Sequence, residues 1–237
     1  MLTSLSLTNF KAWKSIQGMR LAPITGLFGT NSSGKSSILQ FLLMLKQTAD
    51  SPDRGQVLYL GEEKSDKSLA LLGTFDDLLH KAAGERRVSW RLSWKLPKGI
   101  TVSDPEDARA KPLLRGDEVE FTCEISEANG GRLAVDEMAY GFAGHRFVMR
   151  PLPGNRKETG GKYSLSAEGA PFEFRKSRGR PPEGLSPPVK CYGFPDEVRA
   201  AFQNAGFLSD LELEFERQMQ GMFYLGPLRE YPFRDYR

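Results

Sequence analysis

Residues 24–45 read ITGLFGTNSSGKSSILQFLLML, and this stretch decides the fold class of the chain. The apolar run 24–28 predicts a short strand, and a loop rich in glycine and serine follows it. An apolar helix is predicted to begin near Lys35. Apolar residues cover nearly every face of this helix, which indicates burial against a sheet. Its apolar run is much shorter than the roughly 20 residues that a bilayer requires, so we expect no membrane span here.

The loop has the spacing of a P-loop: glycine, four residues, then Gly-Lys-Ser. Gly29 and Gly34 let the backbone turn tightly and approach phosphate groups, and successive N–H groups then form an anion nest at the positive end of the helix. Lys35 is predicted to reach the β- and γ-phosphates of ATP, and the Ser36 hydroxyl to bind Mg²⁺. The alternative is a polar turn that only caps a buried helix. The predicted nucleotide-binding residues are Gly29, Thr30, Asn31, Ser32, Ser33, Gly34, Lys35, Ser36 and Ser37.

Composition excludes several other classes of protein. The chain has 237 residues and a formal net charge of +3, which is too weak to indicate nucleic-acid binding by itself. We expect a cytoplasmic protein, because the first residues contain no apolar segment of signal-peptide length. Cys123 and Cys191 belong to no CxxC motif and are predicted to be buried thiols in a reducing compartment. With only His80 and His145, the chain offers little for a histidine-based metal site or catalytic triad.

The rest of the chain predicts an α/β fold with a mixed sheet around the P-loop helix and a largely antiparallel β lobe. Residues 3–8 and 14–21 predict a hairpin before the P-loop. Alternating apolar residues predict further strands at 88–96, 118–125, 146–150, 162–166 and 171–175. Trp90 and Trp94 fall on one face of the first of these strands and are predicted to be core residues. A helical pattern broken at Gly206 and a buried strand come last, at 195–219 and 222–225. We predict an ATPase core at 1–87, a β-rich lobe at 88–190 and a connecting segment at 191–237.

Several segments resemble a known family. LSLTNFK (5–11) and GLFGTNSSGKSSILQ (26–40) look like the head of an ABC-type P-loop ATPase of the SMC, RecF and OLD-nuclease group. LLGTFDDLLH (71–80) and YLGPLREYPFRDYR (224–237) are similar to stand-alone ATPases of that group, many of them found in anti-phage defence loci. One departure is Ser32, which stands where these P-loops most often have glycine. A serine is tolerated there if its backbone is not left-handed.

The resemblance implies an N-terminal half of an ATPase head. The signature serine motif, the acidic Walker B strand and the switch histidine of the pattern are missing from these residues. It also implies that ATP lies between two heads, in a homo-oligomer, and that hydrolysis switches an effector protein or domain. No catalytic residue is assigned. Asp76 and Asp77 are expected to be charges at a helix N-terminus, and Asp136 and Glu137, which follow a short apolar run, are the nearest candidates for the metal-binding acid.

Two alternative functions and one added activity remain open at this point. The chain could bind nucleotide without hydrolysing it, as a regulatory or assembly module, or it could be a P-loop kinase for small molecules. It could also bind DNA, because ten basic and four acidic residues give segment 146–190 a net charge of +6, against −3 for the remainder. Within that segment, the proline-rich stretch 175–188 is a loop that either follows a nucleic-acid backbone or is simply solvated, and it has no aromatic residues for base stacking.

Overall fold

A single antiparallel sheet forms the framework of the molecule. The computed structural model describes residues 1–237 except 64, 66–67, 105–111, 155–160, 178–182 and 227–237. The sheet has seven strands in the order β2-β1-β3-β4-β5-β6-β7, and every neighbouring pair is antiparallel. The strands are β1 (Leu2–Phe10), β2 (Trp13–Arg20), β3 (Arg87–Val102), β4 (Leu114–Glu127), β5 (Leu133–Phe142), β6 (His145–Pro151) and β7 (Tyr163–Gly169).

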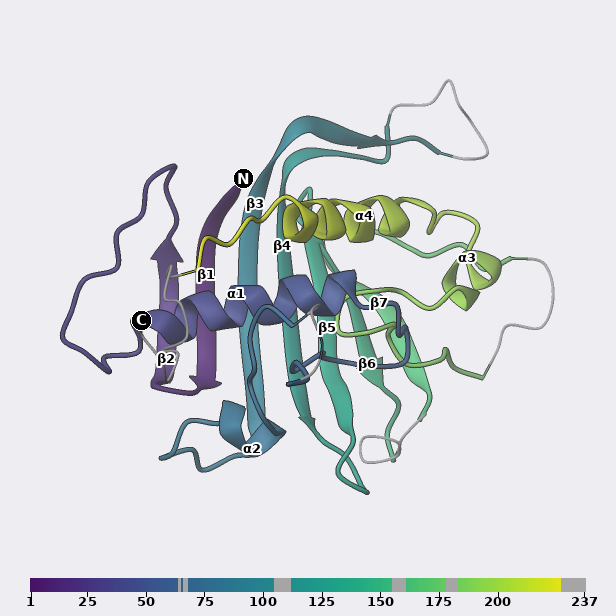
Figure 1. The fold of residues 1–237 in the computed structure, drawn as a ribbon. Coiled ribbons are helices and arrows are strands. Elements are labelled where there is room, and N and C mark those ends of the chain that lie inside the picture. Colours follow the sequence, from purple (N-terminus) through teal and green to yellow (C-terminus); the bar gives the residue numbers. More distant parts are fainter. Residues whose placement is uncertain (64, 66–67, 105–111, 155–160, 178–182, 227–237) are drawn as a thin grey trace, which may run out of the picture.

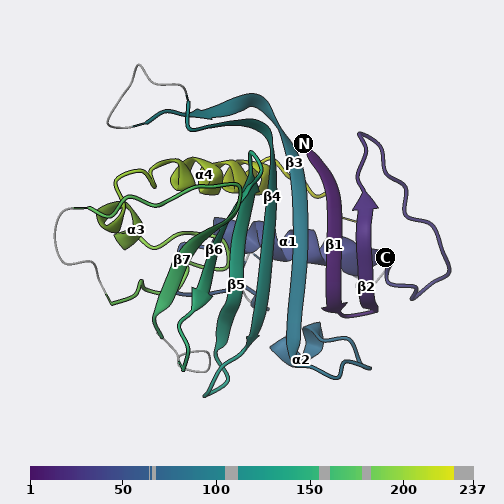
Figure 2. The same ribbon diagram turned by 180° about the vertical axis from the view of Figure 1, so that it is seen from behind.

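Two long helices cover one face of this sheet (Figure 1). They are α1 (Lys35–Asp50), which follows the P-loop, and α4 (Phe207–Gln220). The opposite face of the sheet is open when the molecule is seen from behind (Figure 2). Two short helices, α2 (Phe75–Leu78) and α3 (Glu197–Ala201), lie at the margins of the sheet. The break between α3 and α4 includes Gly206, which confirms the predicted interruption of the helical pattern.

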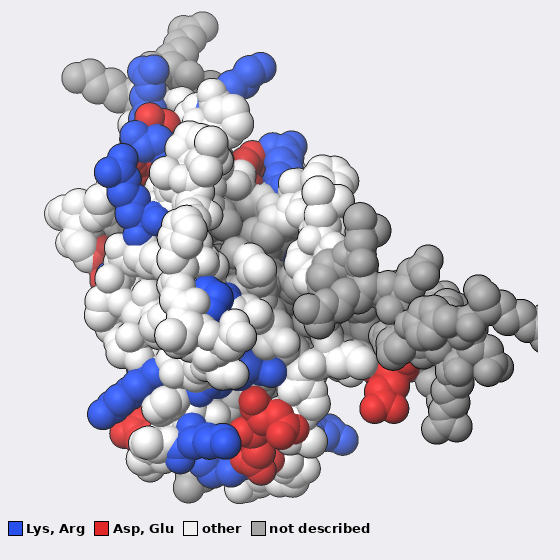
Figure 3. Space-filling view, turned by 60° about the vertical axis from the view of Figure 1, so that its left-hand side comes forward, with Lys and Arg blue, Asp and Glu red and all other residues white. Residues whose placement is uncertain are grey.

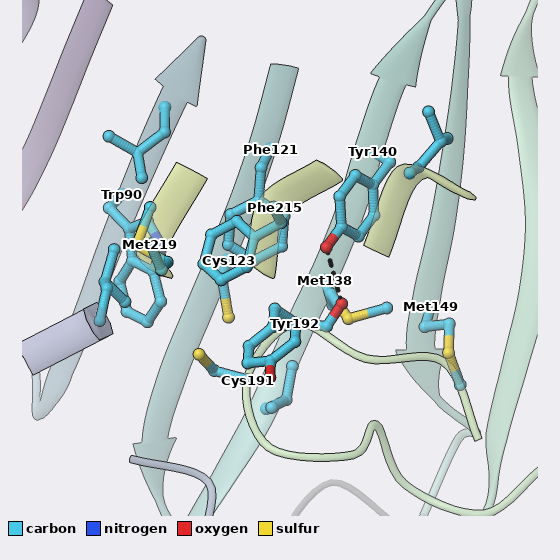
Figure 4. Packing of buried hydrophobic residues seen from close by; sticks show 14 of the residues in the cluster. Trp90, Phe121, Cys123, Met138, Tyr140, Met149, Cys191, Tyr192, Phe215 and Met219 are labelled. Atoms are coloured by element: carbon cyan, nitrogen blue, oxygen red, sulfur yellow. Dashed lines mark hydrogen bonds between the residues drawn. The ribbon is translucent and has the colours of Figure 1, made fainter. Parts of the chain in front are cut away.

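The core lies between the sheet and the two long helices. Alternating side chains of β3 and β4 point to this side, as their period of two predicts. The Phe41 ring of α1 meets Trp90 edge-on with centroids 5.6 Å apart, and the Phe215 ring of α4 lies 4.8 Å from that of Phe121. Figure 4 shows the packing of Phe215 against Phe121. Trp90 and Trp94 are both buried, which confirms their assignment to the core.

Hydrogen bonds from buried polar groups fix the layers around α1 and α4. The Gln47 amide nitrogen donates to the carbonyl oxygens of Tyr59 and Ala70 and its oxygen accepts from Leu69 and Ala70 N–H, so α1 holds the two segments beside it. The ammonium of Lys46 lies 3.3 Å from the carbonyl oxygen of Met219, at the end of α4. These bonds satisfy groups that would otherwise destabilise the core.

One carboxyl group of α4, that of Glu212, is half-buried beside a hollow of about 310 Å³ that residues of α3 and α4 line. Burial raises the pKa of Glu212 to about 7; the N–H of Phe194, 3.2 Å away, opposes the shift, and the neighbouring charge of Glu216 adds to it. The folded protein therefore holds a proton on Glu212 at a pH where an exposed glutamate is ionised.

Two predicted strands are absent from the described structure, and this corrects the sequence analysis. Residues 24–28 and 222–226 form no strand, and four of their apolar side chains are almost fully exposed: Ile24 (92%), Phe28 (93%), Phe223 (93%) and Leu225 (95%). Leu27 and Met222, in the same segments, are partly buried against the core. No described strand lies beside either segment, so their backbone groups have no ladder to join. The mixed sheet predicted around the P-loop helix is therefore not confirmed. We call these four exposed residues the apolar flank.

A third predicted strand, 171–175, is also wrong. The Arg175 N–H donates to the side-chain oxygen of Asn204, and the Arg175 carbonyl oxygen accepts from the Gln203 N–H. The Asn204 amide also donates to the carbonyl oxygen of Glu173. Because one asparagine side chain and the neighbouring loop satisfy this backbone, the segment packs against the sheet without joining it.

The sheet crosses the boundary predicted between residues 87 and 88, because β1 pairs with β3. The domain boundaries themselves remain predictions. In the part of the chain that the structure describes, no helix is long and apolar enough to span a bilayer.

Candidate phosphate-binding site

The P-loop begins α1 with the backbone that its glycines predict. Gly29 has φ 149° and Gly34 has φ 89°, values that favour glycine at both positions. Gly34 is the residue before the first turn of α1, and no side chain caps that turn. The N-terminal N–H groups of a helix of 16 residues therefore face the loop without an acidic neighbour in the first turn. This is the arrangement that binds anions.

Lys35 folds its side chain back into the loop. Its Nζ lies 2.9 Å from the carbonyl oxygen of Gly29 and 2.6 Å from that of Thr30, and 3.4 Å from the Ser33 hydroxyl. Three oxygen atoms of the loop thus hold the Lys35 ammonium group inside the P-loop. Ser36 is exposed in the first turn of α1, where its hydroxyl is free to serve as one ligand of Mg²⁺.

The cradle leaves no space for larger residues at its two key glycines. A Cβ on Gly29 would lie 2.9 Å from the Ser33 hydroxyl oxygen. A Cβ on Gly34 would lie 2.8 Å from the Cβ of Ala12 and 2.9 Å from Nε1 of Trp13. The residues present therefore fit a bound phosphate chain, with backbone N–H groups and Lys35 as donors and Ser36 facing a phosphate-bound magnesium ion.

Ser32 departs from the expected conformation. Its φ is 62°, so this serine is left-handed, whereas the sequence analysis required a backbone that is not left-handed. The left-handed region costs a non-glycine residue roughly 1 kcal/mol. The loop backbone keeps the left-handed conformation that a glycine would adopt at this position, and Ser32 is therefore strained.

A contact that the sequence analysis missed joins the hairpin to the loop. The indole N–H of Trp13, the first residue of β2, donates to the carbonyl oxygen of Gly34 at 2.9 Å. No motif marks this tryptophan, because the contact exists only once the β1–β2 turn has folded against α1. Phe10, the last residue of β1 before this turn, is fully buried and belongs to the core.

The carboxylates near residue 76 serve local structure. Thr74 and Asp77 form a capping box at the start of α2, in which the Asp77 carboxylate accepts from both the N–H and the hydroxyl of Thr74 at 2.8 Å. Both bonds lower the pKa of Asp77, and the bond from the Thr74 backbone N–H contributes most. Asp76 pairs with Arg86. The interpretation of both aspartates as charges at a helix N-terminus is confirmed.

Asp136 and Glu137 do not lie at the P-loop. They belong to β5, which is four strand positions from β2, or roughly 19 Å at the usual strand spacing. Asp136 is buried with the Arg87 Nε 3.5 Å away. Burial alone would raise the pKa of Glu137, but hydrogen bonds from Arg146 and Arg150 outweigh it and lower that pKa. A carboxylate that pairs with two arginines far from the loop is poorly placed to bind its metal.

No acidic cluster replaces them within the described residues. There, no group of three or more histidine, cysteine, aspartate or glutamate side chains could hold a metal ion. Ser36 is then the one predicted protein ligand of magnesium that the structure places at the loop.

Three of the six described basic residues of segment 146–190 form ion pairs. Arg146 and Arg150 both contact Glu137 and Glu168 on the open face of the sheet. Arg175 lies 2.8 Å from Asp104. Lys190 is buried and donates to the carbonyl oxygen of Ala49. Arg156, Lys157, Arg178 and Arg180 lie outside the described residues, as do Arg229, Arg234 and Arg237.

Comparison with known proteins agrees with this geometry. The family model of the AAA ATPase domain matches residues 1–134, which include the P-loop and the first four strands. The chain belongs to the AAA ATPase domain family. That membership supports a nucleotide-binding ATPase function. A search of curated proteins gave no match.

Proposed function

We propose that this chain is the ATP-binding half of an ABC-type ATPase head, which binds Mg-ATP through residues 29–37. The observation that carries the proposal is the cradle itself. It joins the uncapped start of α1, glycines at the points of close approach and a lysine whose ammonium already lies within the loop. These features occur in a member of the AAA ATPase domain family.

Hydrolysis needs more than this cradle. Phosphoryl transfer requires an acidic residue that helps to hold Mg²⁺ and a group that positions the attacking water. The candidate carboxylates of the described residues are paired elsewhere, as Asp76 with Arg86 and Glu137 with Arg146. We therefore propose that another segment or chain supplies the acid.

The apolar flank supports this proposal. Figure 1 shows that the loop before α1 and the segment after α4 both run to the β2 side of the molecule. Figure 3 looks at that side, where most residues in the middle are uncharged around a small basic patch, and further charged residues gather above and below. We propose that strands of a further sheet cover Ile24, Phe28, Phe223 and Leu225, convert both segments into strands and bring an acidic residue beside Ser36. The resulting sheet would be the mixed sheet of the predicted fold.

The remaining parts of the proposal rest on the resemblance. They are a homo-oligomer with ATP between two heads, an attached or partner effector that hydrolysis switches, and a role in anti-phage defence or DNA maintenance. The first rival is a module that binds nucleotide without hydrolysing it. The candidate carboxylates favour this rival for the described residues taken alone, because they form ion pairs away from the P-loop. A small-molecule kinase is the weaker rival, because such an enzyme needs an arginine-bearing lid and an acceptor site soon after the P-loop, whereas this chain continues into the long strands β3 to β7.

Calorimetric titration of the 237-residue chain with Mg-ATP tests the proposal, together with a turnover assay. We expect binding, negligible turnover, and binding about ten- to a hundredfold weaker in Lys35→Ala, because a charge-assisted contact to phosphate is lost. Lys98→Ala, which removes an exposed lysine of β3, is the matched control and should bind as the wild type does. Robust turnover would contradict the need for a second acid-bearing segment. Absence of binding would contradict the proposed function itself.

DNA binding by segment 146–190 stays a separate proposal. Because Arg146, Arg150 and Arg175 are paired, any such site depends on the remaining basic residues. The test is the dependence of DNA affinity on salt concentration. A slope near zero, or no binding at low salt, would remove this idea.

A further inference from the structure

The turn between β1 and β2 touches the P-loop through a single side-chain hydrogen bond. Trp13 donates its indole N–H to the Gly34 carbonyl oxygen at 2.9 Å, and the same oxygen accepts from the Ser37 N–H at 3.0 Å. The turn is so close that a Cβ on Gly34 would collide with Trp13 and Ala12. Gly34 is therefore required for contact with the hairpin as well as for its positive φ.

This turn is strained and firmly held. Asn9 has φ 62° and Lys11 has φ 49°, both in the left-handed region that non-glycine residues avoid. Such strain persists only where the surroundings fix it, and it concentrates at functional sites. Here the segment that includes α2 supplies the bonds: Lys11 N–H to Leu78 oxygen (2.6 Å), His80 N–H to the Asn9 side chain (3.1 Å), and the Asn9 amide to the carbonyl oxygens of Glu85 (2.8 Å) and Arg87 (2.6 Å).

We infer that Trp13 is a positioning residue of the nucleotide site, which acts through the Gly34–Lys35 peptide. A trans peptide is planar, and its C=O and N–H point in opposite directions. The indole holds the oxygen toward the hairpin and so directs the Lys35 N–H away from it, ready to donate to a phosphate in the loop. This inference rests on the proposed function, because it concerns how the same cradle is kept in its binding conformation.

The indole N–H itself reports on this role. Trp90 and Trp94 are buried, and their indole N–H groups have no hydrogen-bond partner among the described residues. The three indole resonances of a ¹⁵N-labelled sample should therefore be distinct, and Trp13→Phe identifies the one that disappears. On saturation with Mg-ADP we expect the Trp13 resonance to shift while those of Trp90 and Trp94 stay. A Trp13 resonance that does not move at saturation overturns the inference.

The affinity for Mg-ADP distinguishes the role of the Trp13 indole N–H from that of its aromatic ring. Trp13→Phe keeps an aromatic side chain on β2 but cannot donate, and we expect it to bind Mg-ADP about fivefold more weakly, as loss of one hydrogen bond implies. Gln17→Ala, on the exposed side of the same strand, is the control and should bind like the wild type. Equal affinity of Trp13→Phe and wild type overturns this inference alone. Failure of the wild type to bind Mg-ADP overturns the proposed function first, so the two failures are distinguishable.

Discussion

The two sides of α1 contrast sharply. Toward the sheet, Phe41, Met44 and Leu45 are fully buried among strands whose backbones are paired. On the β2 side, the apolar flank consists of residues of the same chemical kind that stay exposed. The residues of both regions are apolar, but only those that face the sheet are covered by another layer of the described structure. The comparison teaches that an exposed apolar segment beside a well-formed ligand cradle is itself information about what completes the site.

The largest effect should come from truncating one phenylalanine on each side. Phe215→Ala removes a fully buried ring that packs on Phe121 and Trp94, and we expect it to lower the free energy of unfolding by about 3–5 kcal/mol. Phe223→Ala removes a ring that contacts solvent, and its effect should stay within about 0.5 kcal/mol. Urea unfolding of both variants measures the contrast. If the two lose comparable stability, the flank is packed in solution and the comparison fails.

An effect of intermediate size on the free energy of unfolding should follow from Glu212, the half-buried carboxyl group of α4. Glu212 has a pKa of about 7 when folded and an ordinary value of 4.5, so its contribution to stability is complete below pH 4.5 and declines as the pH rises to about 7. Between pH 5 and pH 8, the wild type should lose about 2–3 kcal/mol more than Glu212→Gln, by the linkage of pKa shifts to stability.

Chemical denaturation at both pH values checks this difference. Asp210→Asn, which neutralises an exposed carboxylate on the same helix, is the control and should follow the wild type. A parallel pH dependence of Glu212→Gln and wild type would show that Glu212 is ionised in the folded protein.

The smallest effect concerns the strain in the loop. Ser32→Gly should change stability by no more than about 0.5 kcal/mol, because relief of the left-handed serine offsets the flexibility of glycine. Ser33→Gly gains no such relief and should destabilise by about 0.5–1 kcal/mol. Urea unfolding measures the difference between the two variants, to which Ser33→Gly also adds the loss of the contact between the Ser33 hydroxyl and Lys35. Equal losses in both variants would mean that the loop relaxes Ser32 out of the left-handed region in solution.

Much of the sheet was predictable from the sequence. Alternation in 88–96 and 118–125 is strong because one face of β3 and β4 is buried and the other is wet. The same rule failed for 171–175, where Phe172 and Phe174 are partly buried against the core but Asn204 takes the backbone bonds. The apolar run 24–28 also failed to predict a strand, because no neighbouring strand is described beside it. Alternation records burial, whereas strand formation also requires a partner for the backbone.

The candidate site was predictable to the extent that it is local. The P-loop spacing gave the cradle residues, since glycine φ values and helix N–H groups depend on a short stretch of chain. Trp13 and the left-handed turn at Asn9 and Lys11 were not predicted, because their roles depend on contacts with Gly34 and with residues 78–87. The pairing of Glu137 with two arginines was equally invisible, since strand register decides it.

The two cysteines of the core have a practical consequence for spectroscopy. Figure 4 shows Cys123 and Cys191 enclosed by aromatic rings, and burial raises the pKa of both thiols, that of Cys191 to about 12. Maleimide reagents attack thiolates at accessible positions, so the native protein should remain unlabelled. A single cysteine introduced at Ile24 or Phe223 would then be the only reactive thiol among the described residues. A fluorophore attached there would register the arrival of a partner layer directly, without removal of either native cysteine.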